Sequence, residues 1–193
     1  YYAAVGGTAE SACSSGSYTA VTGQGSCAFC TAGTFQTASA QTGCDMCTAG
    51  NYCPQGASAV LPCSAGRYSS STGLSSVGQC DTVQPGYFSA AGSTSATACS
   101  KGSYNAAIAH ATCTSCPAGK YQSSAGQTDC LDCIIGSYCP LGASAPISCP
   151  AGRYGSSTSL TAETECSACT AGNACGVGSV APQACSPGFY ADT

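Results

Sequence analysis

One short motif, Cys-x-x-Gly-x-Tyr/Phe, recurs along this chain and constrains its fold more than any other feature. Counting Val83, which stands where the other copies have cysteine, the copies begin at residues 13, 30, 47, 63, 83, 99, 116, 133, 149, 169 and 185. The glycine is present in every copy, and the aromatic residue is replaced once, by Ala174. Such regular recurrence is typical of a linear array of small structural units.

The copies are themselves ordered in a longer repeat. The intervals between their starts follow one order from residue 13 to residue 99, and the same order then begins again, which gives a second, 86-residue period. The predicted organisation is the end of a preceding unit (1–12), a first super-repeat (13–98), a second super-repeat (99–184) and the start of a further unit (185–193). Both ends fall inside a unit, so we expect a segment of a longer array, in which the partner of Cys185 follows the last residue.

The composition makes disulfides the main source of stability. The 193 residues include 19 Cys and 25 Gly, and only 6% are charged. Leu, Ile, Val and Phe are too scarce to build one hydrophobic core for a chain of this length. Cysteine at this density is typical of proteins in an oxidising compartment. We therefore expect a secreted protein, or one on the extracellular face of the cell surface.

The predicted fold class is one of small disulfide-rich repeats. We expect an elongated array of short irregular β ribbons and loops. Helix should be almost absent, because no stretch shows the apolar periodicity of an amphipathic helix.

One difference between the two super-repeats indicates how the cysteines pair. Cys169 and Cys175 have Val83 and Ser89 at the equivalent positions of the first super-repeat. Because losing both partners leaves no unpaired thiol, we expect Cys169 to bond Cys175. By the same logic every unit closes on itself, which predicts the pairs Cys13–Cys27, Cys30–Cys44, Cys47–Cys53, Cys63–Cys80, Cys99–Cys113, Cys116–Cys130, Cys133–Cys139 and Cys149–Cys166. A crossed alternative stays open at this point, with the pairs Cys166–Cys175, Cys169–Cys185 and Cys80–Cys99.

The glycine and the aromatic residue of the motif have structural roles. Beside a disulfide the chain must turn tightly, and glycine tolerates positive φ and a close backbone approach. We expect the ring two residues later to pack over the bridge of its own unit or of the next. The residues assigned to these roles are Gly33 with Phe35, Gly66 with Tyr68, Gly119 with Tyr121 and Gly152 with Tyr154.

The cysteine spacing also fits a zinc ribbon. Two Cys-x-x-Cys pairs follow one another in each super-repeat, at Cys27, Cys30, Cys44 and Cys47 and again at Cys113, Cys116, Cys130 and Cys133. A zinc site would leave the other cysteines without partners. The spacing also arises automatically when bridged loops follow one another at the regular interval of the motif. We therefore expect no metal and no cofactor.

The residue types that catalysis needs do not form a set. His110 is the only histidine and lies in a loop of Ser, Ala and Thr, so we expect a solvated side chain. Asp129 and Asp132 have Gly43 and Met46 at the equivalent positions, so a carboxylate pair is not maintained for acid–base chemistry. Nothing near the Cys-x-x-Cys pairs lowers the pKa of a thiol for redox catalysis. We expect that the chain is not an enzyme.

Charge and hydropathy limit the partners. The net charge is -4, and the four Lys and Arg residues form no basic patch, so nucleic acid is not an expected partner. No apolar run approaches the length of about 20 residues that a membrane-spanning helix needs, so this segment is not expected to contact a membrane. Ser/Thr-rich tracts at 69–72, 93–97 and 156–161 are either O-glycosylated or plain polar loops.

The segments CPAGKYQSSAGQTDCLDC and CSAGRYSSSTG resemble the ephrin-receptor-like cysteine-rich repeats, also called the GCC2/GCC3 family. They are more distantly similar to the modules of tumour-necrosis-factor receptors. The resemblance covers nearly the whole chain and implies an elongated ectodomain stapled by disulfides rather than an enzyme. Val83, Ser89 and Ala174 depart from the family pattern but leave the frame intact.

The sequence thus predicts an extracellular structural repeat protein that forms a rod or filament, in a flagellar appendage, cell coat or matrix fibre. Its expected partners are copies of itself or other chains of a filament. The alternative is the stalk or ligand-binding ectodomain of a cell-surface receptor. Receptor contact surfaces usually carry aromatic or charged anchors in some units. Here the variation between super-repeats is mostly among Ser, Thr and Ala, which favours the structural role.

Overall fold

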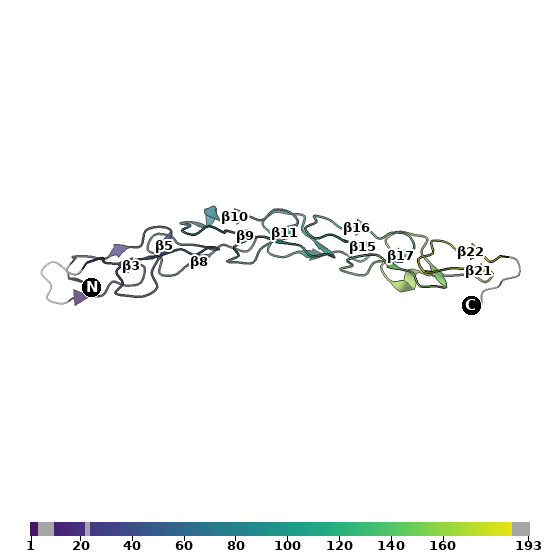
Figure 1. The fold of residues 1–193 in the computed structure, drawn as a ribbon, viewed down its shortest axis with the longest axis horizontal. Coiled ribbons are helices and arrows are strands. Elements are labelled where there is room, and N and C mark those ends of the chain that lie inside the picture. Colours follow the sequence, from purple (N-terminus) through teal and green to yellow (C-terminus); the bar gives the residue numbers. More distant parts are fainter. Residues whose placement is uncertain (4–9, 22–23, 187–193) are drawn as a thin grey trace. The chain divides into compact units, whose positions relative to one another are not determined.

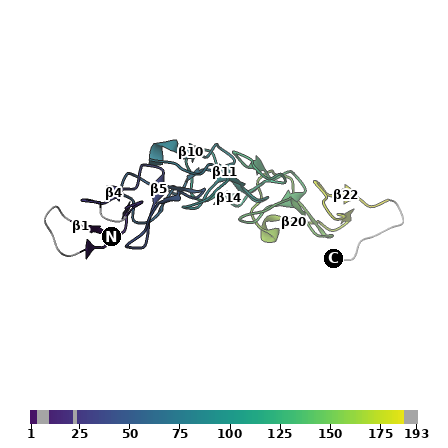
Figure 2. The same cartoon turned by 60° about the vertical axis from the view of Figure 1, so that its left-hand side comes forward.

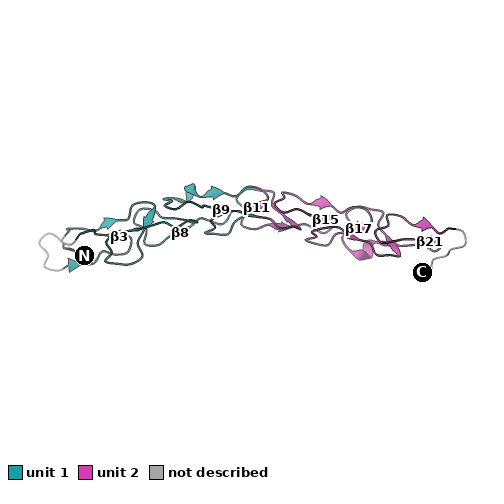
Figure 3. Cartoon of the chain, viewed as in Figure 1, with its two compact units in different colours: residues 1–84, 88–97, 108–112 teal, residues 85–87, 98–107, 113–193 magenta. Residues whose placement is uncertain are grey.

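The computed structural model describes residues 1–3, 10–21 and 24–186. The motif residues Gly188 and Tyr190 therefore lie outside the described residues. The chain divides into two compact units (Figure 3). Unit 1 comprises residues 1–84, 88–97 and 108–112, and unit 2 comprises residues 85–87, 98–107 and 113–193.

The described chain is built from two-residue strands that pair antiparallel in hairpins (Figures 1 and 2). The pairs in unit 1 are β1 (Tyr2–Ala3) with β2 (Glu10–Ser11), β3 (Ser17–Tyr18) with β4 (Ala28–Phe29), β5 (Thr34–Phe35) with β6 (Asp45–Met46), β7 (Asn51–Tyr52) with β8 (Leu61–Pro62) and β9 (Arg67–Tyr68) with β10 (Asp81–Thr82). A further pair joins β11 (Tyr87–Phe88) and β12 (Thr97–Ala98). The pairs in unit 2 are β13 (Ser103–Tyr104) with β14 (Thr114–Ser115), β15 (Lys120–Tyr121) with β16 (Leu131–Asp132), β17 (Ser137–Tyr138) with β18 (Ile147–Ser148), β19 (Arg153–Tyr154) with β20 (Ser167–Ala168) and β21 (Asn173–Ala174) with β22 (Gln183–Ala184).

The predicted fold class of short ribbons with almost no helix is confirmed. Among the described residues the only helical elements are two three-residue 3-10 turns, η1 (Val77–Gln79) and η2 (Glu163–Glu165). Each occurs in one of the longer bridged loops, just before the cysteine that closes it. The fold is therefore an array of small disulfide-rich repeats.

The motif itself determines each hairpin. The first strand directly follows the motif glycine, and the second strand directly precedes the next motif cysteine, as in the pairs Ser17↔Phe29 and Tyr18↔Ala28. At the base of this hairpin the Cys30 amide donates to the carbonyl of Gly16 at 2.9 Å. One copy of the motif therefore specifies one hairpin.

Successive hairpins of unit 1 are joined by backbone hydrogen bonds. The Gly33 amide donates to the Cys53 carbonyl at 2.8 Å, and the Gln36 amide donates to the Ala57 carbonyl at 3.1 Å. In the opposite direction, the Gly56 amide donates to the Cys30 carbonyl at 2.8 Å. These bonds use only main-chain groups, so they depend little on the side chains of either hairpin.

Unit 2 repeats this pattern at the equivalent positions of the sequence. The Gly119 amide donates to the Cys139 carbonyl at 2.8 Å, the Gln122 amide donates to the Ala143 carbonyl at 3.0 Å, and the Gly142 amide donates to the Cys116 carbonyl at 2.8 Å. The two units therefore use the same linkage between neighbouring hairpins.

The motif glycine is required for two reasons, which Gly33 illustrates. Its φ of 90° is unfavourable for residues with a side chain. A Cβ atom at this position would also lie 2.5 Å from the carbonyl oxygen of Gly73, which belongs to the second hairpin further along the chain. Glycine thus allows a contact between next-nearest hairpins as well as a tight turn.

The other assigned glycines have the same backbone conformation. Their φ angles are 81° at Gly66, 84° at Gly119 and 81° at Gly152. A Cβ atom at Gly66 would collide with the carbonyl oxygen of Ala109, and one at Gly119 would lie 2.6 Å from that of Ser159. At Gly152 no heavy atom lies within 4 Å of the Cβ position, so only the φ constraint applies there.

The buried interior consists of small clusters around the bridges instead of one core. Phe35 packs against Cys47, Cys53 and Ala57. Tyr52 packs against Cys63, Leu74 and Cys80, and Tyr121 packs against Cys133, Cys139 and Ala143. Of the two arrangements that the sequence allows, these rings adopt the one in which they cover the bridge of the next hairpin.

Three glycine-to-alanine substitutions separate the two roles of the motif glycine. Gly33→Ala should destabilise the fold by about 3 kcal/mol, because the Cβ atom meets both the φ restriction and a backbone oxygen. Gly152→Ala should lower the free energy of unfolding by about 1 kcal/mol, because only the φ restriction applies there. Gly43→Ala, where φ is not positive and the space is open, should be nearly neutral. Urea unfolding of the oxidised proteins, followed by circular dichroism, measures this order. Equal losses for Gly33→Ala and Gly152→Ala would show that the contact is unimportant.

Candidate functional site

Nine disulfides form among the described residues, and all of them close a unit on itself. Four join cysteines 14 residues apart: Cys13–Cys27, Cys30–Cys44, Cys99–Cys113 and Cys116–Cys130. Two join cysteines 17 residues apart, Cys63–Cys80 and Cys149–Cys166. Three join cysteines 6 residues apart, Cys47–Cys53, Cys133–Cys139 and Cys169–Cys175. The pairs of the crossed alternative do not form.

Cys185 forms no disulfide with a described residue and is half-buried. The bridge expected for this residue therefore stays a prediction.

Two non-cysteine residues occupy the place of a bridge in the first super-repeat. Val83 is fully buried, and Ser89 is 1% exposed. The Ser89 hydroxyl donates to the carbonyl of Arg67 at 3.0 Å. Packing and one hydrogen bond thus replace the covalent link that Cys169 and Cys175 provide in the second super-repeat.

The zinc-ribbon spacing does not correspond to a metal site. Cys27, Cys30 and Cys47 belong to three different disulfides, so their sulfurs are not thiolates that bind zinc. Within the described residues, no group of His, Cys, Asp and Glu side chains is arranged to hold a metal ion. The spacing is therefore a by-product of consecutive bridged loops.

Two arginines have a structural role that sequence reasoning missed. The Arg67 guanidinium donates to the Cys80 carbonyl at 3.0 Å, and that of Arg153 donates to the Cys166 carbonyl at 2.7 Å. Each arginine thus holds the cysteine that closes one of the longer bridged loops. The sequence feature that points to this role is an arginine at the same position of both super-repeats, beside the half-buried Tyr68 and Tyr154.

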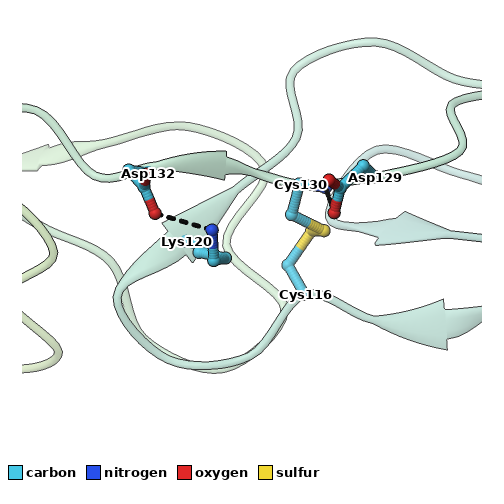
Figure 4. Close-up of polar contacts among 5 residues, drawn as sticks. All are labelled: Cys116, Lys120, Asp129, Cys130 and Asp132. Carbon is cyan, nitrogen blue, oxygen red and sulfur yellow. Dashed lines mark hydrogen bonds and ion pairs between the residues drawn. A yellow bond between two sulfur atoms is a disulfide. The ribbon is translucent and has the colours of Figure 1, made fainter.

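An ion pair distinguishes one hairpin of unit 2. Lys120 and Asp132 are cross-strand neighbours on β15 and β16, and Lys120 Nζ lies 2.6 Å from Asp132 Oδ1 (Figure 4). The hydrogen bond to Asp132 is the main cause that raises the pKa of Lys120, with a smaller contribution from the charge of Asp129. Both side chains of the pair are exposed, so the pair contributes little to stability.

The two aspartates of this hairpin have different roles. Asp129 accepts a hydrogen bond from the Cys130 amide at 2.7 Å, next to the Cys116–Cys130 bridge (Figure 4). Asp132 instead binds Lys120. The structure therefore does not bring the two carboxylates together as an acid–base pair. His110 is exposed, and its carbonyl accepts a hydrogen bond from the Ser89 amide at 3.3 Å.

Several large apolar side chains remain exposed and differ between the super-repeats. Phe29 is 67% exposed and Met46 is 64% exposed. The equivalent residues of the second super-repeat are Ser115 and Asp132. The variation between super-repeats thus includes exposed apolar residues as well as Ser, Thr and Ala.

Phe29 also lines a groove in unit 1. Its other lining residues are Tyr2, Ala12, Ser14, Ser17, Ser26 and Cys27, and its volume is about 390 Å³. Two aromatic rings and four hydroxyl groups border this space, and none of these lining residues is charged. The groove is thus a concave surface suited to a neutral partner.

A family model described as tyrosine-protein kinase ephrin type A/B receptor-like matches residues 106–139. The match covers less than half of the chain and includes the complete bridges Cys116–Cys130 and Cys133–Cys139. Comparison with curated proteins finds no match. The likeness to tumour-necrosis-factor-receptor modules stays a prediction.

The matched module and the nine disulfides together indicate an extracellular domain. Modules of this kind are typically non-catalytic. No helix in the described part of the chain has the length and hydropathy to span a bilayer.

Asp132→Asn should lower the pKa of Lys120 toward its ordinary value, because the hydrogen bond to the carboxylate is the main cause of its elevation. Since the folded-state pKa is the higher one, the pair stabilises the fold below the unfolded pKa of about 10.4, and this contribution is lost as the pH rises through the folded pKa. Titration of the Lys120 side chain by NMR measures the change. Asp129→Asn is the control and should lower the pKa less, so equal decreases would contradict the assignment.

Proposed function

We propose that this chain is part of an extracellular structural rod or filament, such as a flagellar appendage, a cell coat or a matrix fibre. Its partners are then copies of itself or other chains of the filament. The observation that carries the proposal is the linkage between hairpins. In both compact units, each hairpin makes the same backbone hydrogen bonds to the next one, while each disulfide closes only its own hairpin.

This combination of disulfides within repeats and hydrogen bonds between hairpins suits a structural protein. Covalent closure stabilises each bridged loop by about 2–3 kcal/mol in the chain-entropy model. A repeated set of backbone bonds repeats the geometry from one hairpin to the next. The contact of Gly33 with the Gly73 carbonyl adds a restraint between next-nearest hairpins. Such a linkage can be extended by adding copies, because no side-chain recognition has to be designed for each junction.

O-linked glycans on the exposed Ser and Thr residues belong to the same proposal. Ser70 and Ser71 are exposed and fit this role. Ser69 does not, because it is 2% exposed and its hydroxyl accepts a hydrogen bond from the Ser71 amide at 3.2 Å.

Electron microscopy of the native, unreduced material tests the structural role. Regular fibres are expected, with an axial repeat related to the 86-residue period. The repeat should vanish after reduction with dithiothreitol, because the bridges are the main stabilising interaction of each hairpin. Separate particles at every concentration, from material whose disulfides are intact by mass spectrometry, would contradict the filament.

A second candidate function is the stalk or ligand-binding ectodomain of a cell-surface receptor. The match to an ephrin-receptor-like module supports it, as do the exposed Phe29 and Met46 and the groove beside Phe29. Exposed aromatic and sulfur-containing side chains are common at protein interfaces. This function requires a partner that contacts the first super-repeat and not the second.

The double variant Phe29→Ser and Met46→Asp separates the two functions, because it gives the first super-repeat the residues of the second. A receptor surface should lose about tenfold or more in affinity, whereas the proposed filament, whose hairpins are linked by backbone bonds within each chain, should assemble unchanged. Binding of the labelled chain to intact cells and electron microscopy measure the two outcomes. Leu61→Ser, which alters an exposed residue outside the groove, is the control. Unchanged cell binding by the double variant would contradict the receptor function.

A further inference from the structure

The disulfides divide the chain into closed loops and open segments. Most open segments are short, such as that from Cys27 to Cys30. Two are of intermediate length, from Cys53 to Cys63 and from Cys139 to Cys149. The segment from Cys80 to Cys99 contains no further cysteine and is the longest open segment between two bridges.

Residues 81–98 form this unbridged segment, and non-covalent contacts alone hold it. The Val83 amide donates to the Gly66 carbonyl at 3.1 Å, and the Ser89 amide donates to the His110 carbonyl at 3.3 Å. The buried Val83 side chain and the hydrogen bond from the Ser89 hydroxyl to Arg67 add packing and one further contact.

The equivalent hairpin of the second super-repeat shows which interaction the unbridged segment lacks. Around Cys139, a backbone hydrogen bond to the Leu160 carbonyl at 2.9 Å is present together with the bridge to Cys133. In that hairpin the bridge still closes the loop covalently when the hydrogen bond is lost. In the unbridged segment, loss of the corresponding contacts frees the whole hairpin.

Tension along an oxidised chain acts on these two kinds of segment differently. Force passes through the sulfur–sulfur bond of a closed loop, so the residues inside that loop add no length. Only open segments can extend. An extended chain advances at most about 3.5 Å per residue, so the unbridged segment can contribute up to about 65 Å and each intermediate segment up to about 35 Å.

We propose that residues 81–98 are a yielding element, which unfolds as one step under tension while the loops closed by disulfides stay closed. A load-bearing role for this element rests on the proposed structural function. The extensibility itself does not, because it follows from the positions of the bridges. The replacement of Cys169 and Cys175 by Val83 and Ser89 is then a mechanical difference between the two super-repeats.

Single-molecule force spectroscopy of the whole oxidised chain, held between two marker domains, tests this proposal. Between Cys13 and Cys175, one unfolding step of about 60 Å is expected, and all other steps from open segments between bridges should stay below about 35 Å. Residues 1–12 and 176–193 lie outside the outermost bridges, so they contribute equally in every variant. An array whose steps all stay below about 35 Å would overturn the proposal.

Two variants assign the step to its segment. Val83→Cys with Ser89→Cys introduces the missing bridge, so the step of about 60 Å from residues 81–98 should disappear, which lowers the number of steps longer than about 35 Å by one. Persistence of the long step in molecules whose new bridge is confirmed by mass spectrometry would overturn the assignment.

The reciprocal variant, Cys133→Val with Cys139→Ser, removes a bridge from the second super-repeat. It opens the whole stretch from Cys130 to Cys149, which is as long as the stretch from Cys80 to Cys99, and should add a second long step. Its failure to do so would overturn the proposal, even if the first variant did not fold.

Amide hydrogen exchange gives a test without applied force. The Val83 amide should exchange on the order of tenfold faster than the Cys169 amide, which makes the equivalent hydrogen bond to Gly152 at 2.8 Å beside a bridge. Equal rates would show that the missing bridge does not loosen this hairpin.

Electron microscopy of the bridged Val83→Cys, Ser89→Cys protein separates the two proposals, because fibres should form whether or not the segment yields.

Discussion

The disulfides, each of which closes a loop within its own repeat, are the constraint on which the rest of the structure depends. A chain with so few large apolar residues cannot bury a common core, and the fully buried side chains are almost all half-cystines. The motif ring then covers the next bridge, as Phe35 covers Cys47 and Cys53. A bridged hairpin thus contributes its own bridge and receives apolar cover from its predecessor. Stability therefore accumulates along the chain from contacts between neighbouring and next-nearest hairpins.

The linkage between hairpins explains why most side chains vary freely while the glycine does not. Backbone groups make the repeated hydrogen bonds, such as that from Gly33 to the Cys53 carbonyl, so Ser, Thr and Ala interchange at low cost. In most copies, as at Gly33, the glycine also lies against a carbonyl two hairpins away, where even one methyl group lacks space. The compact units are discontinuous in sequence for the same reason. The turn at 108–112, for example, belongs to unit 1 because Ala109 and His110 bond to Val83 and Ser89.

The sequence predicted the hairpin array because the motif encodes it locally, and the joint loss of two cysteines in the first super-repeat revealed the pairing. It did not predict the second role of Gly33, since that contact depends on how far each hairpin is displaced from the last. The bonds of Arg67 and Arg153 to cysteine carbonyls were missed because nothing in the residue type specifies a backbone partner. The exposure of Phe29 was not predicted either, since residue type alone favours burial of a large aromatic ring. The boundaries of the super-repeats stay a prediction.

A scaffold held by bridges and backbone bonds leaves its outward side chains without a structural task. The pairs Phe29/Ser115 and Met46/Asp132 occupy equivalent positions, yet the hairpins that carry them have the same strand pairing. Surface chemistry and internal geometry are therefore independent in this array. A structural filament and a recognition surface thus make separate demands on the sequence: the first on the motif, the bridges and the glycines, the second only on exposed positions. Evolution of a contact surface on such a chain requires no change in the frame that spaces it.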